Sequence, residues 1–356
     1  MNINSFLKLK KMYNAMPKPA REMVGDWLFR RDLNSAIKKH LSEEEFNNRE
    51  LKKQISADVW KCRRTYKTKA SEYFLFGFRN QSNDYRASFL PDRIKDLVLV
   101  HLVGWEAFNN ELKNKWNFYR LTKKWFGREA VLVDCSEDNN LSDFKLFASK
   151  HPDLFIKSNM LSKGRGACLY HITSDKQAES VYALLMKKGG DWIVEEKIVQ
   201  SPIMARWNDS SVNTVRLPAI LNDGKWSVLG AFLRTGRKGA IVDNAGAGGV
   251  FACIDAETGI IYTDGIDEDG VYYAKHPDSG LTYKGWQVPK WKELLDIAED
   301  VHRSMPHHKY VGWDFALTDK GWILIEGNWG QLVSQYNDHI GLKKQFFELL
   351  GIEEKW

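Results

Sequence analysis

The sequence predicts an α+β protein that begins with a mostly helical region. Residues 1–95 show helical spacing and helix caps, whereas residues 150–331 hold three pairs of apolar runs separated by turn-forming residues. Such pairs are typical of β-hairpins, and therefore of antiparallel sheet. Residues 289–305 add an amphipathic helix with its apolar side chains near one face. Helices and hairpins in separate stretches indicate the α+β class.

Length and composition fit a globular protein of two or three domains. The chain has 356 residues, of which 43% are hydrophobic and 28% charged. The N-terminal stretch lacks the apolar core of a signal peptide, and no apolar run reaches membrane-spanning length, so we expect a soluble, cytoplasmic protein. Four widely spaced cysteines without a CxxC pair argue against a cysteine zinc site or a disulfide framework and favour a reducing compartment: Cys62, Cys135, Cys168 and Cys253.

The formal charge of +6 is concentrated early, in Lys8–Lys11 and Lys61–Lys69. Basic runs beside aromatic residues, here Trp60 and Tyr66, occur in nucleic-acid-binding proteins. Solvated helix faces have the same composition, and we favour that interpretation. A modest positive charge also suits an enzyme with anionic ligands.

The first 95 residues carry helix signals and no recognisable chemistry. Residues 27–40 alternate charged and apolar side chains at helical spacing. Ser42 and Glu45 form a capping-box pattern for a helix running toward Trp60. We predict that residues 1–95 are a helical accessory region.

Short elements of alternating type follow. The apolar run 96–103 predicts a buried strand. We then expect a helical segment over 106–126, a strand at 130–133 and a short helix over 142–150.

A glycine-rich loop separates the first predicted hairpin strands, 154–157 and 167–171. Glycine lets backbone N–H groups approach an anion, and the neighbouring Ser, Lys and Arg side chains add donors. The pattern is neither a Walker A motif nor a GxGxxG unit, and an ordinary glycine turn would also fit. The candidate phosphate-binding residues are Ser162, Gly164, Arg165 and Gly166.

A helix over 174–188, capped by Ser174, leads into a predicted buried strand at 191–199. Glu195, Glu196 and Lys197 lie at its end. Because buried charge is costly unless paired, they indicate either a polar ligand there or an edge strand in water.

The second predicted hairpin covers residues 211–236 and carries Asn213, Arg216 and Arg234. The two arginines share a face if the turn at 222–225 has a three-residue loop, and do not with a two-residue loop. On one face they would clamp a carboxylate or phosphate. The glycine-rich loop 236–249 that follows contains Asp243 and Asn244.

The third predicted hairpin, 310–331, brings acids together. A three-residue loop at 319–321 places Thr318 opposite Trp322, Asp314 opposite Glu326, and Gly312 opposite Asn328. Two opposed carboxylates repel each other unless a cation lies between them. Carboxylate and amide oxygens prefer magnesium or manganese to zinc, although a surface hairpin with two solvated acids is the plainer alternative. A closing helix is expected over 342–350.

In order and spacing, these motifs resemble the ATP-grasp superfamily, and most closely its sugar-transfer-associated branch, which is linked to surface polysaccharide synthesis. Lys115 and Lys157 resemble the two nucleotide lysines, and Asp314, Glu326 and Asn328 the metal ligands. The stretch Glu195-Glu196-Lys197-Ile198 resembles the hinge that contacts adenine. The chain departs from the pattern after the hinge, where Gln200-Ser201-Pro202-Ile203 replaces the usual ribose-binding acid.

The resemblance implies two α+β subdomains that grip ATP. We expect a preceding segment at 96–135, a first subdomain at 136–200 and a second at 201–356. It also implies ATP and magnesium, or manganese, as cofactors, with Asp243 and Asn244 among the nucleotide-binding residues. Arg216, Arg234 and Asn213 are the expected catalytic residues.

The resemblance further implies a carboxylate–amine ligase that works through an acyl phosphate, with a sugar acid or amino sugar as substrate. A phosphotransferase and a non-catalytic scaffold that binds a partner through its basic region remain alternatives. For His307-His308 the choice lies between a general base and a solvated loop pair, and we favour the latter.

Overall fold

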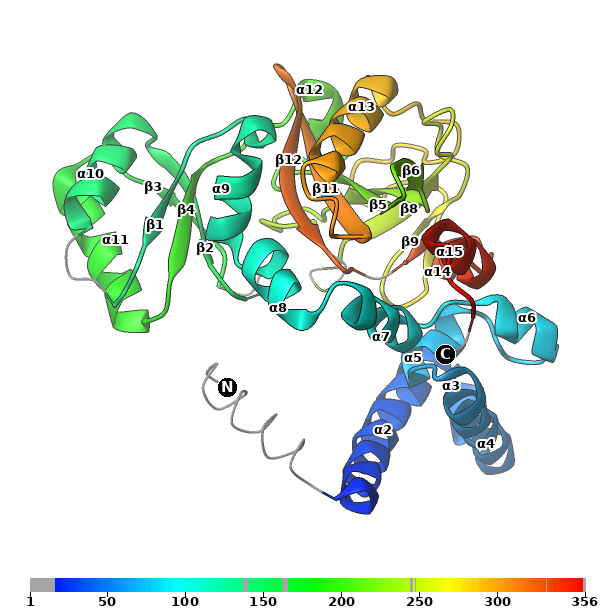
Figure 1. Cartoon of the computed structure of the whole chain (residues 1–356). Coiled ribbons are helices and arrows are strands. Elements are labelled where there is room, and N and C mark those ends of the chain that lie inside the picture. Colours follow the sequence, from blue (N-terminus) through cyan, green and yellow to red (C-terminus); the bar gives the residue numbers. More distant parts are fainter. Residues whose placement is uncertain are drawn as a thin grey trace. The chain divides into compact units, whose positions relative to one another are not determined.

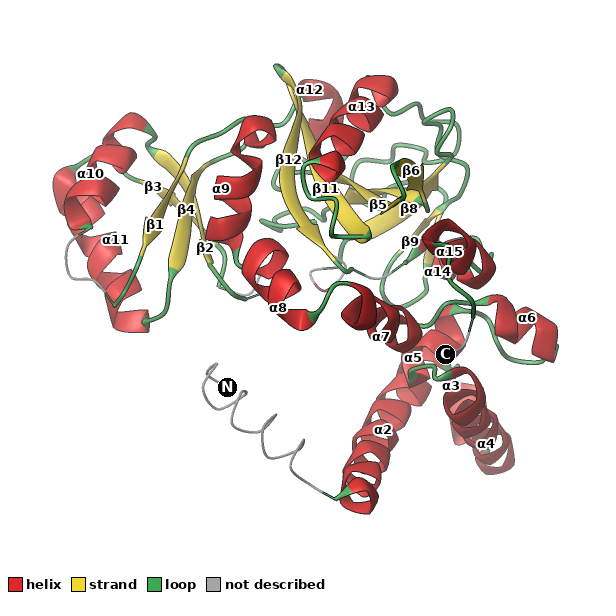
Figure 2. Ribbon diagram, viewed as in Figure 1, coloured by secondary structure: helices red, strands yellow, loops and turns green. Residues whose placement is uncertain are grey.

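A computed structural model describes residues 17–136, 140–161, 166–243, 246, 248–330 and 332–354. The chain divides into two compact units, Met1–Ile94 and Lys95–Trp356, and each is described by itself (Figure 1). The first unit is helical in its described part, and the second holds all the described strands (Figure 2).

The helices of the first unit enclose a core of aromatic rings, among them Phe76, Phe78 and Phe89. The predicted capping box is confirmed. The Ser42 hydroxyl accepts from the backbone N–H of Glu45, and the Glu45 carboxylate accepts from the backbone N–H of Ser42. The helix it starts ends at Asn47, and Asn48 caps the next helix. The helices are α2 (Lys18–His40), α3 (Glu43–Asn47), α4 (Arg49–Tyr66), α5 (Ala70–Leu75) and α6 (Asn83–Ser88).

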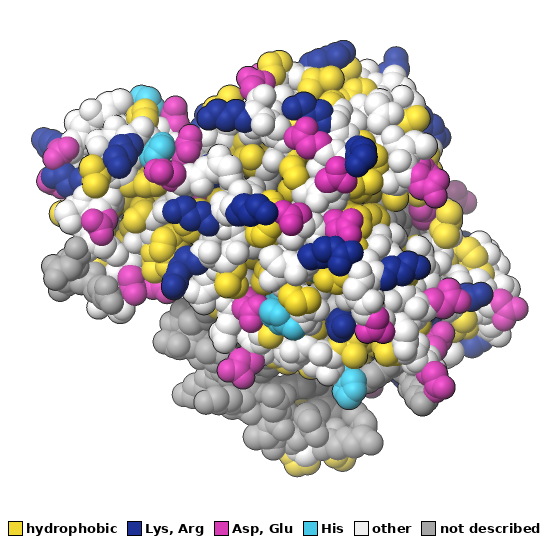
Figure 3. Space-filling model, turned by 45° about the horizontal axis from the view of Figure 1, so that its top comes forward, with side chains coloured by type: hydrophobic (Ala, Val, Ile, Leu, Met, Phe, Trp, Pro, Cys, Tyr) yellow, Lys and Arg dark blue, Asp and Glu magenta, His cyan; other side chains and the backbone are white. Residues whose placement is uncertain are grey.

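Part of the basic run 61–69 is used inside this unit. The Arg63 guanidinium lies 4.1 Å from the Phe29 ring centroid, and Lys69 pairs with Asp92 at 2.6 Å. On the face drawn in Figure 3, Lys and Arg side chains are interspersed with Asp and Glu side chains. Arg63 and Lys69 are therefore engaged by side chains of their own unit. Lys8–Lys11 lies outside the described residues.

The strand predicted at 96–103 is wrong, because this run forms part of helix α7 (Asp92–Leu102). Val98 and Leu99 are buried, whereas Leu97 is 48% exposed. The apolar residues therefore cover one side of a helix, which a short apolar run does not distinguish from a strand. The helical segment that follows is interrupted: α8 (Trp105–Ala107), the π-helical turn η1 (Phe108–Lys113) and α9 (Lys115–Phe126).

A four-stranded antiparallel sheet has the order β1-β4-β2-β3. Helices α10 and α11 cover one of its faces (Figure 1). Phe144 and Phe147 from α10 and Tyr182 and Leu185 from α11 pack there on strand residues such as Val194. The elements are β1 (Ala130–Val133), α10 (Leu141–Lys150), β2 (Asp153–Ser158), β3 (Cys168–His171), α11 (Asp175–Lys188) and β4 (Trp192–Glu196).

The second, eight-stranded antiparallel sheet has the order β10-β9-β8-β7-β5-β11-β12, with β6 paired to β5. Helix α13 packs on β5, β11 and β12, while α9 contacts β12 from the side of the smaller sheet (Figure 1). The strands are β5 (Thr214–Asn222), β6 (Lys225–Val228), β7 (Ala231–Thr235), β8 (Val250–Ile254), β9 (Gly265–Ile266), β10 (Tyr272–Tyr273), β11 (Tyr310–Thr318) and β12 (Gly321–Asn328).

The remaining helices are short except for α13, whose predicted amphipathic character agrees with its buried Trp291, Leu294 and Val301. None of the helices in the described part of the chain is both long and apolar enough to cross a membrane. These helices are α12 (Pro202–Ala205), α13 (Trp291–Arg303), α14 (Ser334–Asn337) and α15 (Lys343–Leu350).

The turn between β11 and β12 is tighter than predicted. Thr318 lies opposite Gly321, so the loop contains only Asp319 and Lys320. The predicted three-residue loop, with Thr318 opposite Trp322, is wrong. A two-residue loop by itself would move the whole ladder by one residue and change which side chains share a face.

A bulge restores the predicted pairing further along the hairpin. Phe315 lies opposite Leu324, and Asp314 lies opposite Glu326, so Ile325 is the extra residue of β12. Such a bulge bends the strand and shifts the register by one residue. The predicted opposition of Asp314 to Glu326, and of Gly312 to Asn328, is confirmed.

The β5 hairpin uses the same device. Its loop also has two residues, Asp223 and Gly224, both at positive φ. The strand then breaks between β6 and β7, and beyond the break Thr214 lies opposite Arg234 and Arg216 opposite Phe232. Arg216 and Arg234 therefore share a face despite the two-residue loop.

Candidate active site

Lys115 begins helix α9 at the boundary between the two sheets. The side chain of Asn114 caps the helix by accepting from the Asn117 backbone at 3.0 Å. Asn159, at the end of β2, accepts from the backbone N–H groups of Lys115 and Trp116, at 3.2 and 2.8 Å. These bonds fix the start of α9 against the smaller sheet and thereby position the Lys115 side chain.

The Lys115 ammonium donates to the backbone oxygen of Leu161, the last described residue before the glycine-rich loop. Burial lowers the pKa of Lys115 to about 8, helped by nearby Lys157 and opposed by Glu326 and Glu195. A cation that has lost much of its hydration gains most from an anionic ligand.

Lys157, on β2, pairs with Glu195 on β4, with 2.7 Å between Nζ and Oε1. Arg128 donates to the other oxygen of Glu195 from Nε at 3.1 Å and from Nη2 at 2.8 Å. Burial alone would raise the pKa of this carboxyl, but Arg128 and Lys157 together lower it. Glu195 therefore stays ionised although it is 2% exposed.

The other expected hinge residues face different surroundings. Glu196 is half-buried, and its carboxylate lies 3.8 Å from Nδ1 of His151. The backbone N–H of Lys197 donates to the Asp153 carbonyl at 3.0 Å, while its side chain is exposed. Ile198 is half-buried.

Arg128 and Asn159 are two buried polar residues of this region that sequence reasoning missed. Arg128 also donates from Nη1 to the backbone oxygen of Leu324 on β12, at 2.8 Å, and so connects the two sheets. Its only signal in the sequence is a charge placed two residues before strand β1. Asn159 has no distinguishing pattern, because its partners are backbone groups far along the chain.

The second cluster of charges lies on β5, β11 and β12. Asp314 has Arg216 opposite it on one side and Glu326 on the other. Arg216 grips both oxygens of Asp314, with 2.6 Å between Nη2 and Oδ2, and donates from Nη1 to the Asn328 amide oxygen at 2.8 Å. Arginine therefore offsets the charge of Asp314, one of the two opposed carboxylates.

Arg234 joins this cluster to Asp243. Its Nη2 donates to Asp243 at 2.8 Å, and Nη1 lies 3.4 Å from Oδ2 of Asp314. The Thr214 hydroxyl donates to Asp243 as well. Burial disfavours the charge of Arg234, but Asp243, Asp314 and Glu326 outweigh it and raise the pKa of the guanidinium.

The two clusters face each other across the boundary between the sheets. The Glu326 carboxylate is the charge that most strongly opposes the effect of burial on Lys115, and Lys157 acts on the same ammonium. Strand β12, which carries Glu326 and Asn328, contacts helix α9. The structure thus brings both lysines and the three predicted metal ligands into one site.

Asn213 lies just before β5 with its amide enclosed by the chain. Its Nδ2 donates to Gln200, to the Met204 carbonyl and to the Asn208 carbonyl, at 2.7–2.9 Å, and Oδ1 accepts from the Gly236 backbone at 3.2 Å. These bonds hold loops together. Gly166 has positive φ and is exposed, and four predicted ligands lie outside the described residues: Ser162, Gly164, Arg165 and Asn244.

The donor set fits magnesium in type, since Asp314, Glu326 and Asn328 offer two carboxylates and an amide oxygen. Glu326 is half-buried, and among the described residues its carboxylate accepts from the Asn328 amide at 3.3 Å. Arg216 and Arg234 already pair with the Asp314 carboxylate, so a metal cation there would compete with these two arginines.

His307 and His308 are not a solvated loop pair. His308 is completely buried, whereas the His307 side chain is 52% exposed. The loop between α13 and β11, which carries both residues, folds back toward η1.

Several solved structures resemble the chain weakly. D-alanyl-alanine synthetase A from Vibrio cholerae is 12% identical, with 70% of this chain and 66% of that chain covered and a TM-score of 0.41. VanG D-Ala:D-Ser ligase from Enterococcus faecalis is 13% identical, with 67% and 61% covered and a TM-score of 0.44. The matched region therefore spans just under two thirds of each of these enzymes. Likenesses this weak do not assign a reaction.

The sequence itself gives the decisive comparison. No curated protein matched it. The family described as sugar-transfer associated ATP-grasp matches residues 106–346, which is more than half of the chain and includes both lysines and the acidic hairpin. The α+β class, the ATP-grasp fold and the predicted resemblance are thereby confirmed. The chain belongs to the sugar-transfer associated ATP-grasp family.

Proposed function

We propose that this protein is an ATP- and magnesium-dependent carboxylate–amine ligase that forms an amide. We further propose a sugar acid or amino sugar as substrate, in surface polysaccharide synthesis, because the family is associated with sugar transfer. The reaction would take place in the cytoplasm, where ATP is available and where four free cysteines are stable.

The convergence of Lys115 and Lys157 with the Asp314–Glu326 hairpin carries this proposal. Glu326 is close enough to Lys115 to favour the charged form of its ammonium, and Lys157 affects the same group. Asp314 lies opposite Glu326 in the hairpin. Phosphate oxygens suit the lysines, and oxygen ligands suit a magnesium ion on the acids. A magnesium–nucleotide complex satisfies both sets of charges at once.

In the proposed reaction, a substrate carboxylate oxygen attacks the γ-phosphorus of ATP and ADP leaves. The nitrogen of the amine then attacks the acyl carbon, expels phosphate and loses a proton. Lys115 and Lys157 would bind phosphate oxygens, and the glycine-rich loop would exclude water. Magnesium held by Asp314, Glu326 and Asn328 would offset the charge that develops on the phosphates.

Arg216 and Arg234 would orient the substrate carboxylate and stabilise the tetrahedral intermediate. Both guanidiniums are held by acids, Arg216 by Asp314 and Arg234 by Asp243. These pairs keep the arginines ordered on one face of the sheet. They also favour a second candidate, a phosphotransferase acting on a hydroxyl, because that reaction needs no guanidinium for a substrate carboxylate.

The test is a screen of sugar acids against amines for ADP release. We expect ADP and phosphate only when both substrates are present, and a product whose mass is that of the amide. AMP and pyrophosphate would contradict the acyl-phosphate route. A product heavier by one phosphoryl group would identify the phosphotransferase, and salt-sensitive nucleic-acid binding without ATP turnover would favour the scaffold.

A further inference from the structure

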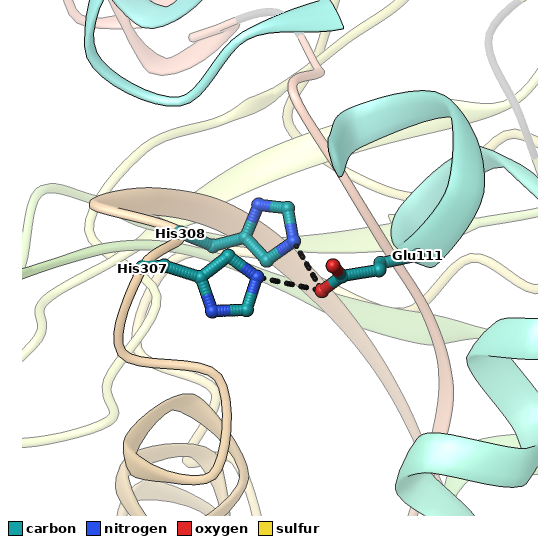
Figure 4. Close-up of side chains that lie close together, drawn as sticks. All are labelled: Glu111, His307 and His308. Atoms are coloured by element: carbon teal, nitrogen blue, oxygen red, sulfur yellow. Dashed lines mark hydrogen bonds and ion pairs between the residues drawn. The ribbon is translucent and has the colours of Figure 1, made fainter. Parts of the chain in front are cut away.

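A second group of ligand-type side chains lies outside the nucleotide site. Glu111 projects from the π-helical turn η1, and His307 and His308 project from the loop between α13 and β11 toward it (Figure 4). Nε2 of His307 lies 2.6 Å from Oε2 of Glu111, and Nε2 of His308 lies 3.1 Å from the same oxygen. We propose that Glu111, His307 and His308 bind a divalent transition-metal ion of the zinc type.

The separations suit one ion. One ligand atom from each residue lies within 4.8 Å of the other two. A tetrahedral zinc ion with bonds of about 2.0–2.2 Å holds its ligand atoms roughly 3.3–3.5 Å apart. Small side-chain rotations would therefore admit the ion between the two rings and the carboxylate.

The donor chemistry selects the class of metal. Two imidazole nitrogens and one carboxylate are a typical three-residue set for zinc with a fourth position left to water or substrate. Magnesium and calcium prefer all-oxygen surroundings and are disfavoured by imidazole. The Glu111 and His307 side chains are 30% and 52% exposed, which leaves that fourth position open to solvent.

Contacts within the fold hold the ligand residues in place. The backbone oxygen of His308 accepts from Nε2 of the buried His302 at 2.7 Å. The backbone N–H of His308 donates to the Met305 carbonyl at 3.0 Å. On the other side, the Phe108 ring of η1 stacks on Trp329 with 4.3 Å between centroids. Binding therefore requires little ordering of the chain, which favours affinity.

The position of the group indicates what an ion would do. Turn η1 ends at Lys113, and the next residue, Asn114, caps α9 directly before Lys115. An ion would thus tie the loop that precedes β11 to the segment that positions a phosphate-binding lysine. The role is a positioning one, and the metal site itself rests on its own geometry rather than on the ligase proposal.

The chain supplies a matched control. His151 also contacts two glutamates, with 3.0 Å from Nε2 to Glu129 and 3.8 Å from Nδ1 to Glu196. These contacts use opposite nitrogens of the ring, so the three groups cannot converge on one ion. His151→Ala therefore removes a histidine with two carboxylate contacts without touching the proposed site.

The experiment measures zinc binding to the full-length protein after treatment with a chelator. Calorimetry and elemental analysis should give one tightly bound zinc per chain, and excess magnesium should leave it in place. Cobalt should produce the visible absorption of a tetrahedral ion with nitrogen ligands. We expect Glu111→Gln and His307→Ala each to weaken zinc binding by more than about 100-fold, and His151→Ala to leave it unchanged.

Thermal unfolding provides a second readout and checks folding. In chelator, both site variants should melt cooperatively, since His307 is half-exposed and Gln preserves the shape of Glu111. Zinc should raise the melting temperature of the natural protein and of His151→Ala, but not that of Glu111→Gln or His307→Ala. Equal zinc binding by the natural protein and both site variants would overturn the proposal and identify Glu111, His307 and His308 as an ordinary hydrogen-bonded cluster. An equal loss in His151→Ala would do the same.

Discussion

From the lowered pKa of Lys115 we predict that nucleotide binding at the proposed site depends on pH. Below about pH 8 the ammonium is protonated both in the free protein and in the complex, so affinity does not change with pH. Above it, the free protein loses the proton, while the phosphate charges of a bound nucleotide favour the charged form. Binding then takes up a proton and weakens as the pH rises.

The size of the effect follows from the shift. Burial brings the pKa of Lys115 from its ordinary value of 10.5 to about 8, and we expect a bound nucleotide to return it at least to the ordinary value. The dissociation constant should therefore rise about tenfold between pH 7 and 9, which is about 1.4 kcal/mol.

The assay is calorimetric titration with a non-hydrolysable ATP analogue and magnesium between about pH 7.5 and 9.5. Two buffers with different ionisation enthalpies count the protons taken up on binding. Lys115→Arg is the control, because arginine keeps its charge throughout this range and should give an affinity that does not change with pH. The reasoning fails if the natural protein shows no slope, or if Lys115→Arg retains it.

Three further predictions concern single residues. Glu326→Gln should abolish turnover while the melting temperature stays within a few degrees of that of the natural protein; unchanged turnover at limiting magnesium would refute a metal role. Lys157→Ala should weaken nucleotide binding in calorimetry and, because buried Glu195 loses one of its two cationic partners, lower the free energy of unfolding by about 2 kcal/mol. Unaltered nucleotide affinity would count against that site. Gly259→Ala should lower the free energy of unfolding by about 3 kcal/mol, measured in urea, because a Cβ at this positive-φ position would lie 2.4 Å from the Trp291 side chain. An unchanged midpoint would show that Trp291 moves aside freely.

Elements with strong local signals could be predicted from the sequence. The caps at Ser42 and Ser174 and the amphipathic helix at 289–305 each depend on residues within one or two turns, and the structure contains all three. The run 96–103 failed because four consecutive apolar positions fit a strand and a buried helix equally well. What decides there is packing, with Leu99 buried and Leu97 exposed.

The site could be predicted in part, since strand pairing placed Asp314 opposite Glu326. The pairing within one hairpin could not reveal the ion pair between Arg216 and Asp314, because that contact depends on the register of a third strand, β5. Arg128 and Asn159 were missed for a similar reason, as their partners lie far away in the chain. Cysteine spacing excluded only thiolate metal sites, so it said nothing of Glu111 and His307.

The extra residue in β12 allows the strand register at the acidic end of the hairpin to differ from the register at its tip. Without it, a change of one residue in the length of the tip at Asp319-Lys320 would exchange the inner and outer faces along the whole ladder. With it, the register at the acidic end differs by one residue from the register at the tip, and Ile325 is the residue that makes up the difference. A hairpin with a tip one residue longer and without Ile325 would place Asp314 opposite Glu326 in the same way. Hairpins with tips of different length can therefore hold the same pair of acids.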